Sequence, residues 1–263
     1  MKKKILIFIP AYNVADHIVK TFSLIPFNLL NKIADISYLI IDDSSQDKTL
    51  QKIDWILSRY KKLNIVIKKN KNNIGYGGVQ KYAFNYSIKN KFDACIMLHG
   101  DGQYHPKFLI KFILTFISLL KSSKKNLNIT GIIFGSRMLK SKDAIIGGMP
   151  LYKFFGNKIL TYLQNKLLST KISEFHSGYR MYNVTALKKT NFNKLTDKFH
   201  FDTEIILECL KLNFIIREFP ISTHYGNQVS NLKSIPYGID VLIATLKFSF
   251  KKLFFTYRHQ INI

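Results

Sequence analysis

The chain of 263 residues is 47% hydrophobic, which is enough to bury a sizeable core as one large domain. Its formal net charge of +24 predicts an anionic partner, such as nucleic acid, acidic lipid headgroups or a phosphorylated substrate, although the abundance of Lys beside Asn, Ile and Phe also indicates compositional bias. Two cysteines exclude a disulfide framework, and no apolar run has the length of a transmembrane helix.

Short apolar runs alternate with helical patterns through the first half of the chain. This alternation predicts an α/β fold with a mostly parallel sheet and helices on both faces. Right-handed crossovers would bring the loops that follow the strands to one edge of that sheet. The predicted strands are 4–10, 36–41, 63–67 and 94–98. The predicted helices are 15–24, 47–60 and 106–120, with a further helix that follows the turn at 73–78 and runs to about residue 90.

The second half of the chain shows the same elements in a less regular order. It predicts strands at 130–134 and 214–219, helices at 152–168 and 201–212, a loop at 138–149 and a turn-rich segment at 174–180. A last helix of Leu, Ile, Phe and Lys is expected at 235–257. We therefore expect one domain over residues 1–230, followed by a C-terminal amphipathic helical extension over 231–263.

The turn after the fourth strand carries three polar side chains, His99, Asp101 and Gln103. Their spacing of two would aim all three the same way on an extended backbone. Oxygen and imidazole donors at a strand end suit a divalent cation that itself holds phosphates. The alternative is a tight Asp-Gly turn followed by a helix that starts at Pro106.

Two adjacent carboxylates, Asp42 and Asp43, end the second strand. Buried carboxylates are unfavourable without a partner, so one of them is expected to accept hydrogen bonds from the base or ribose of a nucleotide. The alternative is the start of the next helix, with Ser45 as its N-cap. The glycines at 75, 77 and 78 could let the backbone approach a ligand, but a tight turn into a helix explains them slightly better.

Arg137 and Arg180 each follow a small or turn-forming residue, and arginine suits bidentate binding of phosphate. The alternative for each is an ordinary surface arginine. Asp202 and Glu204 fit a structural role and a site role equally well. The histidines at 105, 176, 200 and 224 match neither a zinc motif nor a nucleophile-base pair, so we interpret them as structural or peripheral.

In this order, the motifs resemble those of the family-two glycosyltransferases of the GT-A (Rossmann-like) fold. Within that family, they are most similar to the polyprenyl- and dolichyl-phosphate sugar transferase branch. The resemblance spans residues 7–230 and rests on eight motifs that follow one another along the chain. They are 9–13, 41–49, 73–75, 98–106, 134–137, 177–180, 201–204 and 218–221.

This resemblance implies inverting transfer from a UDP- or GDP-linked sugar to a polyprenyl phosphate. The implied ligands of Mg²⁺ or Mn²⁺ are Asp101, Gln103 and His99. Arg137 and Arg180 would position the acceptor, and Glu174 would be the general base if the acceptor were a sugar hydroxyl. The implied nucleotide site comprises Pro10, Ala11, Tyr12, Asp42, Asp43, Asn73 and Gly75.

Three residues depart from the family pattern. His99 replaces the first Asp of the metal motif, Val14 replaces a common acidic residue, and Glu174 replaces a common Asp. Transfer to a hydroxyl in a cell-surface polysaccharide or lipopolysaccharide is the nearest alternative function. A nucleotidyltransferase and a non-enzymatic nucleic-acid-binding protein are further alternatives, but no motif of either class occurs.

The expected location is cytoplasmic. As a hypothesis, the Lys- and Phe-rich tail over 239–257 lies on the inner face of the cell membrane.

Overall fold

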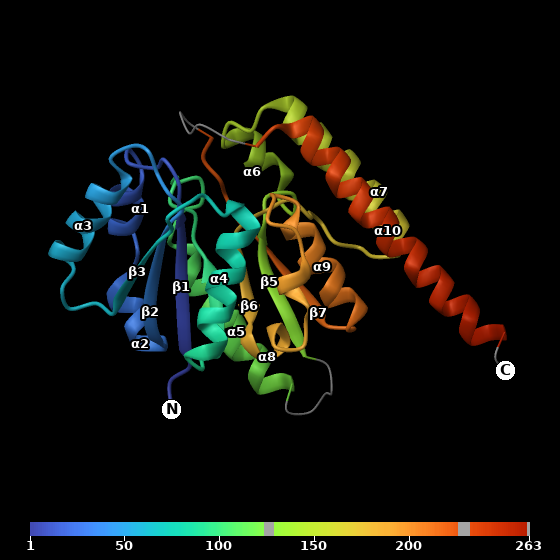
Figure 1. Ribbon diagram of the computed structural model, residues 1–263, viewed down its shortest axis with the longest axis horizontal. Helices are drawn as coiled ribbons and strands as arrows, with labels where there is room; N and C mark the ends of the chain where they lie inside the picture. Colours follow the sequence, from blue (N-terminus) through green and yellow to red (C-terminus); the bar gives the residue numbers. More distant parts are fainter. Residues whose placement is uncertain (124–128, 226–231, 262–263) are drawn as a thin grey trace.

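A computed structural model describes residues 1–123, 129–225 and 232–261, with the side chains of 123 and 251–261 left out of the description. Its centre is a sheet of seven strands in the order β3-β2-β1-β4-β6-β5-β7 (Figure 1). The strands are β1 (Lys4–Ala11), β2 (Asp35–Asp42), β3 (Ile65–Lys69), β4 (Ala94–Met97), β5 (Thr130–Ser136), β6 (Arg180–Asn183) and β7 (Ile215–Pro220).

Helices cover both faces of this sheet (Figure 1). In chain order they are α1 (Ile18–Ser23), α2 (Phe27–Ile33), α3 (Thr49–Arg59), α4 (Gly75–Lys89), α5 (Phe108–Ser123), α6 (Ser141–Ile146), α7 (Leu151–Leu168), α8 (Val184–Leu187), α9 (Phe201–Lys211) and α10 (Ser234–Ile261), with a 3₁₀ turn at Phe192–Lys194.

The sheet is mostly parallel, which confirms the predicted fold class. Only β6 reverses the direction, pairing antiparallel with β4 on one side and β5 on the other. Because of this reversal, the start of β6 lies at the edge where β4 and β5 end. The turn-rich segment 174–180 is therefore brought beside the loops that follow those strands.

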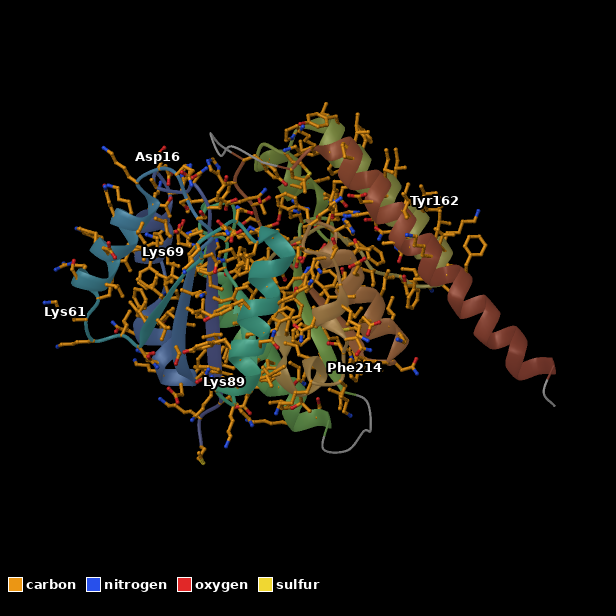
Figure 2. All side chains as sticks on the ribbon, viewed as in Figure 1. Asp16, Lys61, Lys69, Lys89, Tyr162 and Phe214 are labelled. Atoms are coloured by element: carbon orange, nitrogen blue, oxygen red, sulfur yellow. The ribbon has the colours of Figure 1, made fainter. Side chains whose placement is uncertain are left out.

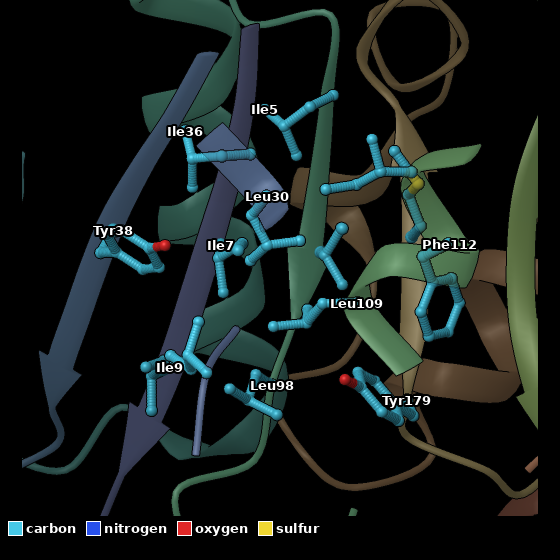
Figure 3. Close-up of a cluster of buried hydrophobic side chains, with 14 of the residues drawn as sticks. Ile5, Ile7, Ile9, Leu30, Ile36, Tyr38, Leu98, Leu109, Phe112 and Tyr179 are labelled. Carbon is cyan, nitrogen blue, oxygen red and sulfur yellow. The ribbon is translucent and has the colours of Figure 1, made fainter. Parts of the chain in front are cut away.

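Alternate residues of β1 enter two separate cores, one on each face of the sheet. Ile5, Ile7 and Ile9 pack with α1, α2 and α5 in one core, whereas Leu6 and Phe8 pack with α4 and α9 in the other. Figure 3 shows the three isoleucines on the side of the sheet that carries Leu30 of α2 and Leu109 of α5. A strand buried on both faces needs apolar residues at every position, since successive side chains point to opposite sides. This is why residues 5–9 of β1 form an unbroken apolar run.

The structure contains elements that the sequence does not predict. Strand β6 and helix α8 are two of them. Two other short helices also differ from the prediction, because α2 is not predicted at all and α6 lies in the segment 138–149, which was expected to be a loop. Ser45 is not the N-cap of α3, because that helix begins at Thr49 and Asp47 Oδ1 accepts the Thr49 N–H at 2.9 Å. Helices α2 and α6 bury few side chains, so they leave little periodicity in the sequence.

Helix α10 packs along α7 and against α9 (Figure 1). The expected boundary between residues 230 and 231 falls within 226–231, which lies outside the described residues. None of the helices described is both long enough and apolar enough to cross a membrane. The two cysteines, Cys95 and Cys209, are free and buried, as expected for core residues.

Candidate active site

The candidate site lies where the chain changes direction across the sheet. From β1 the chain first builds β2 and β3 on one side, then returns to build β4 on the other side. Ligands of open α/β sheets bind beyond the strand ends at such a switch point. At this switch point the loop after β4 lies close to the end of β1. A Cβ added to Gly100 in that loop would lie 3.0 Å from the carbonyl oxygen of Pro10 in β1.

The residues expected to hold the nucleoside do meet at this edge. Ala11 pairs with Asp42 in the parallel register of β1 and β2, and its carbonyl accepts the Asp43 N–H at 2.9 Å. Tyr12, the next residue after β1, is 37% exposed and is thus open to a ligand. Pro10 belongs to the same strand end and is partly buried.

The structure separates the roles of the two adjacent carboxylates. Asp43 accepts the Ile74 N–H at 2.9 Å, the Gly75 N–H at 3.1 Å and the Asn70 amide at 2.8 Å, so it holds the start of α4. Asp42 is also buried, but its Oδ1 has no hydrogen-bond partner among the described residues. Only Asp42 thus keeps an unused acceptor for a ligand, since a buried acceptor without a partner is unfavourable.

The Asn73–Gly75 turn is a packing element. The Asn73 side chain donates to the Asp43 carbonyl at 3.2 Å and accepts the Gly75 N–H at 3.0 Å. Gly75 has φ of +80°, and a Cβ added to Gly77 would lie 2.3 Å from the carbonyl oxygen of Thr196. These two glycines are therefore used for a left-handed turn and for a close approach to another segment, as the alternative interpretation held.

Asp101 and Gln103 line one hollow of about 200 Å³ beside α1. Asp101 Oδ1 accepts the Gln103 N–H at 2.9 Å, and the carboxylate has no other hydrogen bond among the described residues. His224 lines the same hollow, and its backbone N–H donates to the Gln103 carbonyl at 3.3 Å. The sequence predicts a structural or peripheral place for His224, because nothing in the sequence indicates that it pairs with this loop.

A divalent cation fits this donor set only with help from a substrate. No group of three His, Cys, Asp or Glu residues within the described part of the chain could hold a metal ion. A carboxylate and a carboxamide oxygen, with further oxygens from a diphosphate and water, would suit Mg²⁺ or Mn²⁺. The half-exposed position of both side chains leaves room for those additional ligands.

His99 does not join Asp101 and Gln103 in the hollow. Its ring lies 5.1 Å from the Tyr104 ring and 6.0 Å from the Tyr76 ring, measured between centroids. Its Nε2 is buried without a partner, against Gly178. The three residues expected to form one metal site are therefore divided between two sides of the loop.

Glu174 and Arg137 form a buried ion pair. Glu174 Oε2 accepts the Arg137 N–H at 2.7 Å, and Oε1 accepts Arg137 Nε and the Asn157 amide, each at 2.7 Å. Burial by itself raises the pKa of the Glu174 carboxyl, but the Arg137 guanidinium and these hydrogen bonds bring it below its ordinary value. The carboxylate is fully buried and has its acceptors occupied, so this geometry does not present a base to a substrate.

Arg180 is fully buried and bonded to the backbone. Its guanidinium donates to the carbonyl oxygens of Ser177 at 2.6 Å, Phe175 at 2.7 Å and Asp202 at 2.6 Å. Asp202 accepts from Tyr76 and Gln80 through its carboxylate, so it also holds the structure together. The structure thus shows Arg180 shaping the segment beside the site, without an exposed guanidinium for an acceptor phosphate.

The family model described as glycosyl transferase family 2 matches residues 6–190 of this chain. A UDP-N-acetylglucosamine–dolichyl-phosphate N-acetylglucosaminyltransferase of Methanococcus voltae is 25% identical over 255 residues, which cover 92% of each chain. A low-salt glycan biosynthesis hexosyltransferase of Haloferax volcanii is 27% identical over 165 residues, which cover 62% of this chain and 36% of that protein.

Among solved structures, the chain is similar to glucosyl-3-phosphoglycerate synthase of Mycobacterium tuberculosis, crystallised with Mn²⁺, uridine diphosphate and phosphoglyceric acid. The TM-score is 0.63 at 12% identity, with 94% of this chain and 78% of that chain covered. At this identity the likeness establishes the fold alone, and it agrees with the GT-A arrangement of strands. The family match over residues 6–190 establishes more: this chain belongs to glycosyl transferase family 2 and is a nucleotide-sugar-dependent glycosyltransferase.

Proposed function

We propose that this chain transfers a sugar, with inversion, from a UDP- or GDP-linked donor to a polyprenyl phosphate. The observation that carries the proposal is the arrangement at the switch point of the sheet. There, Asp42 keeps an unpaired buried acceptor, and Asp101 and Gln103 line a hollow after β4. The first fits a nucleoside, and the second fits the diphosphate end of the same donor.

Asp101 and Gln103 would hold a divalent cation together with the donor diphosphate. When bound, Mg²⁺ or Mn²⁺ would supply positive charge that stabilises the departing nucleoside diphosphate. Asp42 would orient the nucleoside from the end of β2. Calorimetric binding of UDP- and GDP-linked sugars distinguishes the two nucleotides, and the same measurement with each metal distinguishes Mg²⁺ from Mn²⁺.

Three features support a phosphate acceptor over a hydroxyl acceptor. A phosphate oxygen is already anionic, so its attack needs no general base, whereas a hydroxyl needs one. Glu174, the base expected for a hydroxyl, is engaged by Arg137 and Asn157 in the buried interior. The similar protein of Methanococcus voltae is named for transfer to dolichyl phosphate, which further supports this acceptor class. A cytoplasmic enzyme that meets the membrane at its surface would fit such a substrate.

The proposal is tested by calorimetric binding of UDP-N-acetylglucosamine and GDP-mannose, with and without Mn²⁺. We expect one donor to bind only with the metal, and Asp101→Ala to abolish that binding. Asp16→Ala removes an exposed carboxylate near α1 (Figure 2) and should bind as the wild type does. Metal-independent binding, or no binding of any nucleotide sugar, would contradict the proposed site.

The acceptor is tested separately by following transfer of labelled sugar to undecaprenyl phosphate and to an oligosaccharide. Transfer to the lipid phosphate is expected. Transfer to the oligosaccharide alone would favour the hydroxyl alternative, and it would call for a general base other than the engaged Glu174.

A further inference from the structure

Helices α7 and α10 run parallel and are in contact over 160–167 of α7 and 238–249 of α10. Leu160 of α7 lies 3.5 Å from a Cβ added to Gly238 of α10, Gln164 Nε2 donates to Thr245 Oγ1 at 3.3 Å, and Ser249 Oγ donates to the Leu167 carbonyl at 3.1 Å. The contacts advance together along both helices, which fixes the parallel direction. Figure 1 shows the pair along one side of the molecule.

Each of these helices carries a stripe of exposed apolar side chains. At 100° per residue, each stripe spans an arc of roughly 100° or less, which is a single helix face. Exposed fractions run from 39% at Leu246 to 79% at Ile235. The stripes are Leu151, Tyr152, Phe155, Ile159 and Tyr162 on α7, and Ile235, Ile239, Ile243, Leu246 and Phe250 on α10.

The two stripes face the same side of the molecule. On α7 the buried residues include Phe154 and Thr161, and on α10 they include Val241 and Thr245, so both helices turn one face inward. Because the helices are parallel and in contact, the opposite faces lie next to each other and form one surface. Figure 2 shows Tyr162 at this outer edge of the protein. We call these ten residues the α7/α10 face.

The charges around the α7/α10 face are almost all positive. Helix α7 contains no acidic residue, and Lys158 and Lys166 are exposed along it. The exposed Lys247 borders the stripe on α10. The one acidic residue of α10 is Asp240, which points to His200 Nδ1 at 3.4 Å and thus toward α9. An apolar stripe bordered by lysines is the pattern of a helix lying in the headgroup region of an anionic bilayer.

We propose that the α7/α10 face docks on the surface of an anionic lipid bilayer, with both helices lying in the plane of the membrane. Aromatic rings such as Tyr152 and Tyr162 suit the boundary between headgroups and acyl chains, where one end is apolar and the other is wet. A second copy of this chain fits the face less well, because a symmetric contact would set lysines against lysines on two chains of charge +24.

The first turns of α10 link the α7/α10 face to the buried ion pair of Arg137 and Glu174 through hydrogen bonds. Tyr237 Oη and His176 Nδ1 are hydrogen-bonded at 2.9 Å, and the His176 carbonyl accepts from the guanidinium of Arg137 at 3.0 Å. A membrane on the α7/α10 face would thus lie on the side of the protein where Arg137 and Glu174 are buried. The inference names the membrane partner of the proposed function and rests on it only for the identity of the acceptor lipid.

The first test measures binding to phosphatidylcholine vesicles, with and without phosphatidylglycerol, by co-sedimentation. We expect binding that requires phosphatidylglycerol and falls by about tenfold or more in a variant with three serines on α7. That variant is F155S, I159S and Y162S. The matched control places three serines at comparably exposed apolar positions elsewhere, L29S, W55S and L114S, and should bind within about twofold of the wild type.

The second test separates the local lysines from the overall charge. Among the described side chains of the two helices, three exposed lysines are candidates for neutralisation. Neutralising them should weaken binding several-fold more than neutralising three exposed lysines far from them (Figure 2). The first variant is K158Q, K166Q and K247Q, and its control is K61Q, K62Q and K89Q. Equal losses in the two variants would mean that net charge alone attracts the protein, and this would overturn the proposal.

Oligomeric state supplies the remaining outcome. If the wild type is a dimer that the three α7 serines convert to a monomer, while neither protein binds vesicles, the face is a protein interface and the proposal is wrong. Thermal unfolding of every variant verifies that it is folded. Because vesicle binding is measured without donor, its failure is distinguishable from a failure of the proposed transferase, which donor calorimetry measures without vesicles.

Discussion

The Glu174 carboxylate binds both the backbone and the side chain of Arg137. One carboxylate oxygen accepts the Arg137 N–H, and the other accepts the guanidinium Nε, each at 2.7 Å. Arg137 reaches on to Tyr225 Oη at 2.6 Å, so the pair connects the end of β5 to the segment after β7. Both side chains are buried, and neither can lose its partner without leaving an uncompensated charge.

Glu174→Gln is therefore expected to lower the free energy of unfolding by about 3 kcal/mol, because it leaves the Arg137 charge buried and unpaired. Denaturant unfolding at pH 7 measures the change. Asp54→Asn removes an exposed carboxylate on α3 and should change stability by less than about 0.5 kcal/mol. A Glu174→Gln protein as stable as the wild type but without transferase activity would instead support Glu174 as a general base.

The fold, and the edge of the sheet where the candidate site lies, could be predicted because they depend on local pattern. Continuous apolar runs such as residues 5–9 identify strands buried on both faces, and polar residues directly after those runs identify the edge that binds ligands. Short elements were less predictable. Helix α2 buries only Leu30 and has too few residues to display a period.

The different roles of the residues in the candidate site could not be predicted from the sequence. Asp42 and Asp43 are chemically identical neighbours, and only the contacts of Asp43 with α4 distinguish them. Arg180 resembles a phosphate-binding residue until its three backbone acceptors are known. These contacts join segments distant in the chain, and no local spacing encodes them.

Asp42 and Asp43 should differ in how strongly their substitution affects stability. Asp43→Ala removes three hydrogen bonds that hold the start of α4, and should lower the free energy of unfolding by about 2 kcal/mol. Asp42→Asn removes a charge whose Oδ1 has no partner, so stability should change by less than about 0.5 kcal/mol. Thermal unfolding of the two variants measures this contrast.

The same pair distinguishes ligand binding from structure. If Asp42 binds the nucleoside, Asp42→Asn should weaken donor binding about tenfold in calorimetry, in line with the loss of one charge-assisted hydrogen bond. Unchanged donor affinity in this variant would place the nucleoside elsewhere. Equal destabilisation by both variants would show that Asp42 also has a structural partner.

Gly178 and Gly156 form a second contrasting pair. A Cβ on Gly178 would lie 2.4 Å from His99 Nε2 and 2.9 Å from Tyr76 Oη, so Gly178→Ala should displace His99 and destabilise the protein by about 1–3 kcal/mol. A Cβ on Gly156 in α7 meets nothing within 4 Å, so Gly156→Ala should stabilise the protein by about 0.5–1 kcal/mol. Melting temperatures that shift in the same direction for both variants would contradict this packing.

His176 should make stability depend on pH. Burial of the imidazole lowers the pKa of His176 to about 3. The residue is only partly buried as a whole, but its Nε2 is buried and has no hydrogen-bond partner among the described residues. In the unfolded chain the pKa of histidine is about 6.5, so between these values the unfolded state binds more protons than the folded state. This contribution is therefore fully present above about pH 6.5 and is lost progressively as the pH falls toward 3.

The measurement compares unfolding free energies at about pH 7.5 and pH 5.5 for the wild type and His176→Gln. The variant also loses the hydrogen bond to Tyr237, so it should be less stable at both pH values. Its decrease between them should nevertheless be smaller than that of the wild type by about 1 kcal/mol, since it has no imidazole to protonate. Identical decreases in the wild type and His176→Gln would mean that His176 titrates normally in the folded protein.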